Sequence, residues 1–202
     1  MKARQKPFNI VVCGVGGQGN ILISRLIGRI LTDQGYTVSI GETFGAAQRG
    51  GSVFSCLRVS KEQLYGPIIP DGQADVIISL EPMEALRQLK TLGNPEVMVL
   101  TNTKTVNPVQ VPIGEETYPD FEQLRAAIAN LSKQAWFIPA TDIAMEIGAP
   151  IIANIVMLGA LVGSGAMEIS LDEAESEVRV TIPESKHDIN LRALKKGYEA
   201  AK

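Results

Sequence analysis

The spacing of apolar residues predicts alternating strands and helices. Residues 8–13 and 75–80 are short continuous apolar runs, the pattern of strands that are buried on both faces of a parallel sheet. After Asn20, apolar side chains recur every three or four residues, as on one face of a helix, and Gly35 ends that pattern. The alternation predicts an α/β protein with a Rossmann-like open, mainly parallel sheet flanked by helices.

The other elements follow from the same spacing. Strands are predicted at residues 8–13, 37–41, 52–59, 75–80, 96–100 and 135–138. Helices are predicted after Asn20, from Glu81-Pro82, across 121–131, and as additional C-terminal helices at 151–162, after the capping box of Ser170 and Glu173, and at 184–201. We expect the first two strands to pair in parallel through a right-handed crossover, and the C-terminal helices to pack on the same sheet.

One predicted helix is unusual, because residues 151–162 are apolar nearly all round. Such a helix lies either in the core or under another subunit. It also carries Asn154, which must find a hydrogen-bond partner if it is buried, and the backbone, another subunit or a ligand would each serve.

Composition favours a single globular domain spanning residues 1–202. The chain is 45% hydrophobic and 20% charged with a net charge of −3, unlike disordered or fibrous chains. Aromatic residues make up only 5% and no basic run occurs, so the sequence predicts no nucleic-acid binding. No apolar stretch reaches the roughly 20 residues of a membrane-spanning helix and no export signal is visible. We therefore expect a cytoplasmic protein without membrane contact.

The cysteines and the single histidine give no sign of catalysis or metal binding. Cys13 and Cys56 lie in predicted strands and in no CxxC motif, so this chain alone builds no iron–sulfur cluster or zinc finger. Inert buried thiols are expected. His187 is expected to pack in the core or at an interface, and Asp142 with Glu146 forms an acidic pair typical of a solvated helix face. No metal site and no catalytic residue are predicted.

A glycine-rich turn follows the first strand. Gly14, Gly16 and Gly19 satisfy G-x-G-x-x-G between a strand and a helix, and Gly17 and Gln18 lie inside the motif. Glu42 follows at the end of the second strand, where a dinucleotide fold places its ribose-binding acid. The glycines either admit a phosphate to the helix N-terminus or simply let the helix pack closely on the strand.

A second small-residue loop precedes the third strand. It contains a run of five residues suited to an anion, namely Gln48, Arg49, Gly50, Gly51 and Ser52. The arginine offers a rigid fork of donors and the glycines leave backbone N–H groups approachable, which favours a phosphate or carboxylate clamp over a plain surface turn. Because ligands of open α/β sheets bind at the carboxyl ends of the strands, both loops belong to one candidate site.

These motifs together resemble a known family. The likeness is carried by the turn 14–19, the stretch from Glu42 to Ser52, and residues 81–87, 154–161 and 190–199. In this combination they resemble the pyruvate/ketoisovalerate oxidoreductase gamma-type domain of 2-oxoacid:ferredoxin oxidoreductases. Within that family the likeness favours the branch that acts on indolepyruvate and other arylpyruvates, with a pyruvate- or 2-oxoglutarate-type enzyme as the alternative.

The resemblance implies a non-redox subunit that is inactive alone. Complexes of the family oxidatively decarboxylate a 2-oxoacid to an acyl-coenzyme A and pass the electrons to ferredoxin. Thiamine diphosphate, Mg and iron–sulfur clusters would then belong to a partner alpha subunit, since Asp71-Gly72 here follows Pro70 and makes no Gly-Asp-Gly signature. This chain would bind no cofactor alone, would contact coenzyme A at the subunit interface, and would form a homodimer when isolated.

Two other functions fit the residues. One is a self-sufficient dinucleotide-binding protein with Glu42 on a ribose hydroxyl, although such a fold has no need of the loop from Gln48 to Ser52. The other is an interaction subunit with no ligand of its own. It differs from the oxidoreductase subunit only in whether the glycine loops contact anything.

Overall fold

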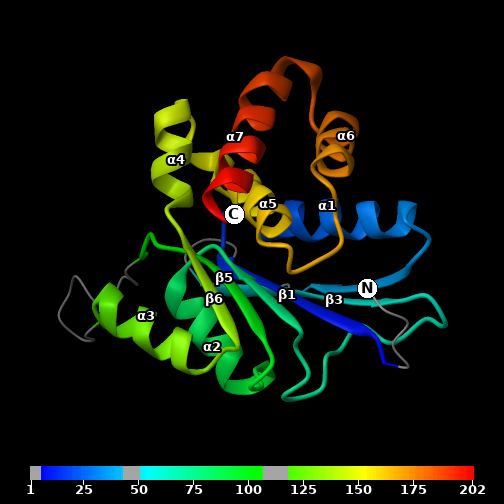
Figure 1. Cartoon of the computed structure of the whole chain (residues 1–202), viewed down its shortest axis with the longest axis vertical. Coiled ribbons are helices and arrows are strands. Elements are labelled where there is room, and N and C mark those ends of the chain that lie inside the picture. Colours follow the sequence, from blue (N-terminus) through cyan, green and yellow to red (C-terminus); the bar gives the residue numbers. More distant parts are fainter. Residues whose placement is uncertain (1–5, 43–50, 107–117) are drawn as a thin grey trace.

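The computed structural model describes residues 6–42, 51–106 and 118–202. Within these residues, six strands form one sheet in the order β2-β3-β1-β4-β5-β6 (Figure 1). The strands are β1 (Phe8–Val15), β2 (Thr37–Glu42), β3 (Ser52–Ser60), β4 (Val76–Ser79), β5 (Met98–Asn102) and β6 (Gln134–Ile138). β1, β4, β5 and β6 are parallel, whereas β3 is antiparallel to both of its neighbours. The predicted α/β class with a mainly parallel sheet is confirmed.

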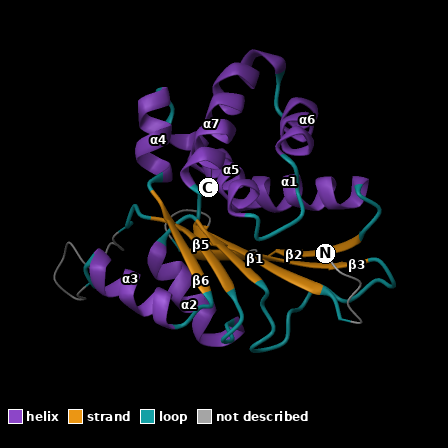
Figure 2. Ribbon diagram, viewed as in Figure 1, coloured by secondary structure: helices purple, strands orange, loops and turns teal. Residues whose placement is uncertain are grey.

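Helices cover both faces of the sheet (Figure 2). They are α1 (Asn20–Asp33), α2 (Pro82–Leu92), α3 (Phe121–Asn130), α4 (Ala140–Ile147), α5 (Ala153–Ser164), α6 (Leu171–Thr181) and α7 (His187–Ala200), with short 3₁₀ turns η1 (Pro150–Ile152) and η2 (Glu184–Lys186). α2 and α3 lie on one face and the others on the opposite face. α4 is absent from the predicted elements, and the predicted helix at 184–201 divides into η2 and α7.

β1 is the centre of the molecule and is buried along its whole length. Its side chains alternate between two cores. Ile10 and Val12 join the core under α1 and α5, whereas Val11 and Cys13 join the core under α2. A strand buried on both faces needs a continuous apolar run, which explains the sequence pattern at residues 8–13.

α5 belongs to the core, which decides between the two possibilities for this apolar helix. It lies between the sheet and α7, and it contacts β5, β6 and α7 (Figure 1). The two helices approach so closely that a Cβ on Gly159 would lie 2.0 Å from the Leu194 carbonyl oxygen, and one on Gly197 would lie 1.9 Å from the Val156 carbonyl oxygen. Of the C-terminal helices, α5 meets the sheet and α7 covers it as an outer layer.

The predicted parallel pairing of the first two strands is wrong. β3 lies between β1 and β2, pairing with β1 from Phe8–Val59 to Val15–Ser52 and with β2 along the whole of β2. β2 is half exposed and suits the edge of a sheet, whereas the middle of β3 is buried and suits the interior. The more apolar strand therefore takes the inner position.

Candidate functional site

The candidate site lies where the connections leave the sheet in opposite directions. After β1 the chain enters α1 on one face, and after the adjacent β4 it enters α2 on the other face (Figure 2). In open α/β sheets, the crevice outside the carboxyl ends of two such strands is where ligands bind. Two turns line it: the glycine turn after β1 and the turn at Leu80-Glu81 after β4.

The glycine turn needs its glycines. Gly17 and Gly19 have φ angles of 97° and 91°, in the left-handed region that other residues rarely adopt. A Cβ on Gly14 would lie 2.7 Å from the Gln18 Oε1 and 3.0 Å from the Leu80 Cβ, so the turn also requires close approach there. Close packing therefore explains part of the motif.

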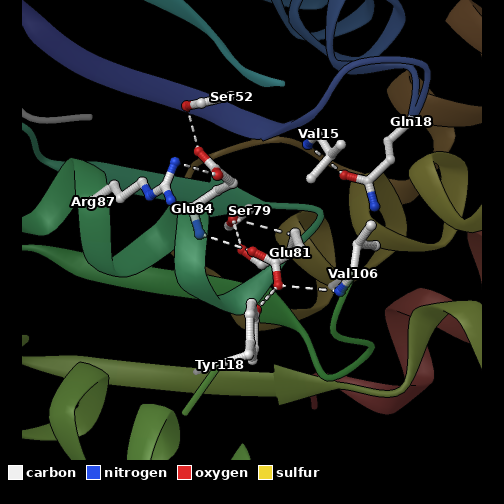
Figure 3. Close-up of polar contacts among 9 residues, drawn as sticks. All are labelled: Val15, Gln18, Ser52, Ser79, Glu81, Glu84, Arg87, Val106 and Tyr118. Carbon is white, nitrogen blue, oxygen red and sulfur yellow. Dashed lines mark hydrogen bonds and ion pairs between the residues drawn. The ribbon is translucent and has the colours of Figure 1, made fainter. Parts of the chain in front are cut away.

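Gln18 connects the two turns. Its Oε1 accepts a 2.7 Å hydrogen bond from the Val15 N–H (Figure 3). Its Nε2 donates a 3.2 Å hydrogen bond to the Leu80 carbonyl oxygen. Both ends of the amide are engaged by backbone, so the side chain fixes the spacing of β1 and β4 at the crevice. Its contribution to any ligand site is to position the turn.

The N-terminus of α1 has donors to offer. Within the part of the chain that the structure describes, no side chain caps this helix and its first turn holds no acidic residue. The N–H groups of Leu22 and Ile23 reach the Gly19 carbonyl oxygen, whereas those of Asn20 and Ile21 have no acceptor among the described residues. Unpaired N–H groups and the helix dipole together favour an anion at this end.

Asn20 adds a second unusual feature at the same place. Its side chain is 4% exposed, and its Oδ1 accepts no hydrogen bond from the described residues. Most buried polar atoms have a partner, so this unpaired acceptor in the first turn of α1 requires a donor from outside the described residues, such as the O–H of a water molecule.

Of the second predicted loop, residues 48–50 (Gln48, Arg49, Gly50) lie outside the described residues. The end that the structure describes joins the crevice, because the Gly51 carbonyl oxygen accepts a 2.9 Å hydrogen bond from the Gly16 N–H. The Ser52 hydroxyl donates to Glu84 Oε2 at 2.5 Å (Figure 3). The backbone thus brings the two glycine loops together, while the Ser52 side chain is committed to α2.

Glu42 does not reach the glycine turn. Because β3 intervenes, β2 lies two strand spacings, about 10 Å, from β1. The Glu42 carboxylate instead lies 3.6 Å from the Nε of Arg25 on α1. A dinucleotide fold needs the second strand beside the first for its acidic residue to meet the ribose, so this arrangement does not favour dinucleotide binding.

In the turn after β4, the N-terminus of α2 is capped by glutamate side chains of the same segment. The sequence prediction did not include these glutamates among the site residues. Glu81 is 1% exposed and caps α2 by accepting the Glu84 N–H at 2.9 Å. Its other oxygen accepts the Val106 N–H and the Tyr118 O–H (Figure 3). Burial raises the pKa of Glu81, and burial beside Glu81 raises the pKa of the Tyr118 hydroxyl. In the sequence, the predicted helix start at Glu81-Pro82 was the local signal that could have identified Glu81 as a residue of this turn.

Glu84 completes this closed turn. Its carboxylate is buried and lies 3.3 Å from Arg87 in addition to accepting the Ser52 hydroxyl. The Glu81 carboxylate accepts an N–H of the first turn of α2, and both acidic side chains suit the positive end of the helix dipole. The N-terminus of α2 is therefore unavailable to an anion.

The weaker candidates resolve as structural groups. Cys13 and Cys56 are buried, and burial raises the pKa of both thiols, which leaves no reactive thiolate. The His187 ring is half-buried, and its Nε2 lies 2.8 Å from the Ile182 carbonyl oxygen, so it joins α7 to the end of α6 and does not pack in the core. Glu146 pairs with Lys196 at the surface.

Asn154 meets the glycine turn. Its side chain is 5% exposed, and its Oδ1 accepts the Ile155 N–H at 2.8 Å. Its Nδ2 lies 2.2 Å from the position that a Cβ on Gly19 would occupy. Across the three described segments, no group of three or more metal-ligating side chains gathers, and no helix is long and apolar enough to cross a membrane.

The fold and the crevice define a Rossmann-like α/β protein whose topological switch point holds a glycine-built helix N-terminus that no side chain of the described residues caps. The chain belongs to the pyruvate ferredoxin/flavodoxin oxidoreductase family, whose pattern it matches over residues 9–200. The resemblance noted in the sequence is thereby confirmed.

Relatives and solved structures agree with this family. Two proteins named indolepyruvate oxidoreductase subunit IorB are similar: that of Thermococcus kodakarensis is 37% identical over 98% of this chain and 97% of its own length, and that of Archaeoglobus fulgidus is 38% identical over 96% and 95%. The fold matches a 2-oxoglutarate:ferredoxin oxidoreductase from Magnetococcus marinus, solved with 2-oxoglutarate, coenzyme A and succinyl-CoA bound. That match has a TM-score of 0.74 at 23% identity and covers 98% of this chain and 31% of the larger one.

Proposed function

We propose that this chain is the non-redox subunit of an oxidoreductase complex that converts indolepyruvate, or another arylpyruvate, to an acyl-coenzyme A with electrons passed to ferredoxin. The observation that carries the proposal is the similarity to indolepyruvate oxidoreductase subunits along nearly the whole of both chains. Thiamine diphosphate, Mg and the iron–sulfur clusters belong to the alpha subunit in this proposal, and the present chain is inactive alone.

The crevice supplies the chain's own contribution. In this proposal, the backbone N–H groups around Gly16 to Gly19 that have no acceptor within the turn bind a ligand anion, and the Arg49 guanidinium binds the same anion. The Gly16 N–H is not one of these donors, because it donates to the Gly51 carbonyl oxygen. Gly14 permits the close approach of the turn, while Gln18, Glu42 and Ser52 hold the surrounding strands in place. The anion is a phosphate of coenzyme A or the carboxylate of the oxoacid, bound where this chain meets the alpha subunit.

Arg49 provides a direct test of that role. In the assembled complex, Arg49→Ala is expected to raise the KM for coenzyme A or for the oxoacid about tenfold, the loss of one charge-assisted contact. Arg49→Lys retains the charge but not the forked donor geometry of the guanidinium. Its KM is expected to lie between those of the unaltered complex and Arg49→Ala. Unchanged KM values for both substrates in Arg49→Ala would remove the loop from the proposal.

Assembly tests the function itself. We would purify the native protein, identify what accompanies it, and assay coenzyme A-dependent reduction of a low-potential acceptor with arylpyruvates. A thiamine- and iron–sulfur-containing partner with arylpyruvate activity supports the proposal. Activity with only 2-oxoglutarate or pyruvate would assign the chain to another branch of the family. A chain that purifies alone and binds NAD would overturn the proposal.

A further inference from the structure

We propose that the cavity between α2 and the outer strands β2 and β3 binds a small, neutral, largely apolar molecule that carries an amide group. Gln88 is the residue that binds this amide group. The proposal goes beyond the proposed function and does not rest on it, because it concerns the middle of α2 and not the N-terminus of α2 at the crevice.

The cavity exists because α2 does not extend to the edge of the sheet. α2 packs on β1, β4 and β5, whereas the chain that follows β3 folds back over the outer strands. A Cβ on Gly41 of β2 would lie 3.0 Å from the Pro67 Cβ, so this segment lies directly against β2. Between the segment and α2 lies a cavity of about 500 Å³. Sites for small molecules commonly have volumes of roughly 300–1,000 Å³.

The walls of the cavity are mainly apolar and are held in place. Phe54 and Cys56 of β3 line one side, and residues 67–69 line another. Arg58 fixes this second wall, because its Nη1 donates 3.0 Å hydrogen bonds to the carbonyl oxygens on both sides of Pro67. The cavity is therefore formed before any molecule enters it.

Gln88 is the unusual residue in this cavity. It lies on the buried side of α2 with 8% of its surface exposed, and it lines the cavity. One turn earlier on the same side of the helix, the Glu84 carboxylate is paired with Ser52 and Arg87. One turn later, Leu92 is apolar. Among the described residues, the Gln88 side-chain amide has no hydrogen-bond partner. Buried amides nearly always have one, and a molecule in the cavity would supply it.

The charges around the cavity favour a neutral molecule. Glu42 and Arg87 are the ionised side chains that line it. The Glu42 carboxylate lies 3.6 Å from Arg25 on α1, and Arg87 lies 3.3 Å from Glu84, so each charge is already balanced. An ion in this apolar cavity would lose its hydration without gaining a partner. Burial raises the pKa of the Cys56 thiol, so the cavity offers no thiolate for covalent attachment.

An amide is the group that best complements Gln88. The glutamine side chain has one acceptor oxygen and two N–H donors, so another amide pairs with it through two hydrogen bonds. A ketone or an ether engages only the donors. The apolar remainder of the molecule would contact Phe54, Ile69 and Leu92. These contacts define the ligand class as aromatic or branched aliphatic amides that fit the cavity.

Titration of the full chain with benzamide tests the proposal. Binding is followed by the amide resonances in ¹H–¹⁵N NMR, with toluene as the analogue without an amide and benzoate as the charged analogue. Benzamide is expected to bind saturably, to shift the side-chain N–H resonances of Gln88, and to bind at least tenfold more tightly than benzoate. Gln88→Leu should weaken benzamide binding about tenfold and leave toluene binding unchanged. Gln134→Leu, at an exposed position of β6, is the control and should bind both probes as the unaltered chain does.

Thermal unfolding distinguishes a ligand-binding Gln88 from a structural one. Because no described residue bonds to its amide, Gln88→Leu should melt at or above the temperature of the unaltered chain. A lower melting temperature would show that the fold needs this amide and would overturn the proposal.

The binding results have equally clear consequences. Saturable benzamide binding that Gln88→Leu weakens and Gln134→Leu leaves intact supports the proposal. The absence of saturable benzamide binding, equal binding of benzoate, or equal benzamide affinity of Gln88→Leu and the unaltered chain would overturn it. Co-purification of the alpha subunit tests the proposed function separately, since it reports assembly and not occupation of this cavity.

Discussion

The two turns at the crevice have the same topology but differ in how the helix after each turn begins. Each follows a buried parallel strand and leads into a helix, yet α2 begins under the Glu81 and Glu84 carboxylates while α1 begins at bare glycine. A helix N-terminus that needs only stability receives a capping acid, as α2 does. Among the described residues no side chain caps the α1 N-terminus, and the proposed function uses this N-terminus to bind an anion.

Gly19→Ala should have the largest effect on this comparison. The new Cβ would lie 2.2 Å from the Asn154 Nδ2 at a φ of 91°, so steric overlap adds to backbone strain. We expect a loss of about 3 kcal/mol in the free energy of unfolding, measured by urea denaturation. Gly17→Ala is the matched control, because its φ is 97° and nothing lies within 4 Å of its Cβ. It should lose only about 1 kcal/mol. Equal losses would mean that the Asn154 contact has no energetic weight.

Gln18→Leu should have the next largest effect. The change removes the acceptor of the Val15 N–H and one of the two donors to the Leu80 carbonyl oxygen, which keeps its hydrogen bond from Asn102. The unpaired Val15 N–H should cost about 2 kcal/mol in unfolding free energy. Gln134→Leu, at an exposed position of β6, should change stability by less than about 0.5 kcal/mol. If Gln18→Leu were as stable as its control, the amide would not be what connects the two turns.

Ser52→Ala probes the closed turn. It removes the hydroxyl that donates to the buried Glu84 carboxylate, while Arg87 continues to pair with that carboxylate. We expect a loss of about 1 kcal/mol by chemical denaturation and no change in phosphate affinity. Ser185→Ala, in the exposed η2 turn, should be neutral. Weaker phosphate binding by Ser52→Ala would contradict the separation of the two turns.

The smallest expected effects concern the pH dependence of stability. They should have opposite signs at the two helix-capping glutamates, Glu81 and Glu173. Burial raises the pKa of Glu81 above its ordinary 4.5, so the folded state takes up a proton before the unfolded state does. Stability of the natural chain relative to Glu81→Gln should therefore increase as the pH falls from 7 toward 4.5. Urea midpoints across this range measure the trend, and a relative stability that decreases on acidification would contradict it.

Glu173 in the capping box of α6 supplies the opposite case. Hydrogen bonds from Ser170 and Gln34 lower the pKa of Glu173. Its stabilising contribution is present above the ordinary pKa of 4.5 and is lost as the pH falls below it. The natural chain should thus lose stability relative to Glu173→Gln in that range, and parallel trends for the two glutamates would show that burial of Glu81 is not what distinguishes them.

The fold was largely predictable because local spacing determines which face of an element is buried. The continuous apolar run of residues 8–13 identified the central strand, and Ser170 with Glu173 identified the start of α6. The order of strands was not predictable in the same way, because apolar spacing does not specify which strand is the neighbour. β3 took the place expected for β2, and that exchange removed Glu42 from the glycine turn.

The candidate site was predictable only in part, for a related reason. The glycines were identified because a tight turn between a strand and a helix needs glycine at fixed spacings, and this spacing can be read from the local sequence. The partners of the site are distant in sequence: Gln18 bonds to the backbone 62 residues away, and Ser52 to a carboxylate 32 residues away. The Asn154 contact with Gly19 depends on how α5 packs, which no local pattern encodes.

Crystallography of the full chain with selenate tests the difference between the two turns most directly. Selenate has the shape of phosphate, and its anomalous signal locates it without ambiguity. The account predicts an anomalous peak at the N-terminus of α1 and none at the N-terminus of α2. A peak at α2, or none at α1, would contradict the claim that one turn is open to a ligand and the other is closed.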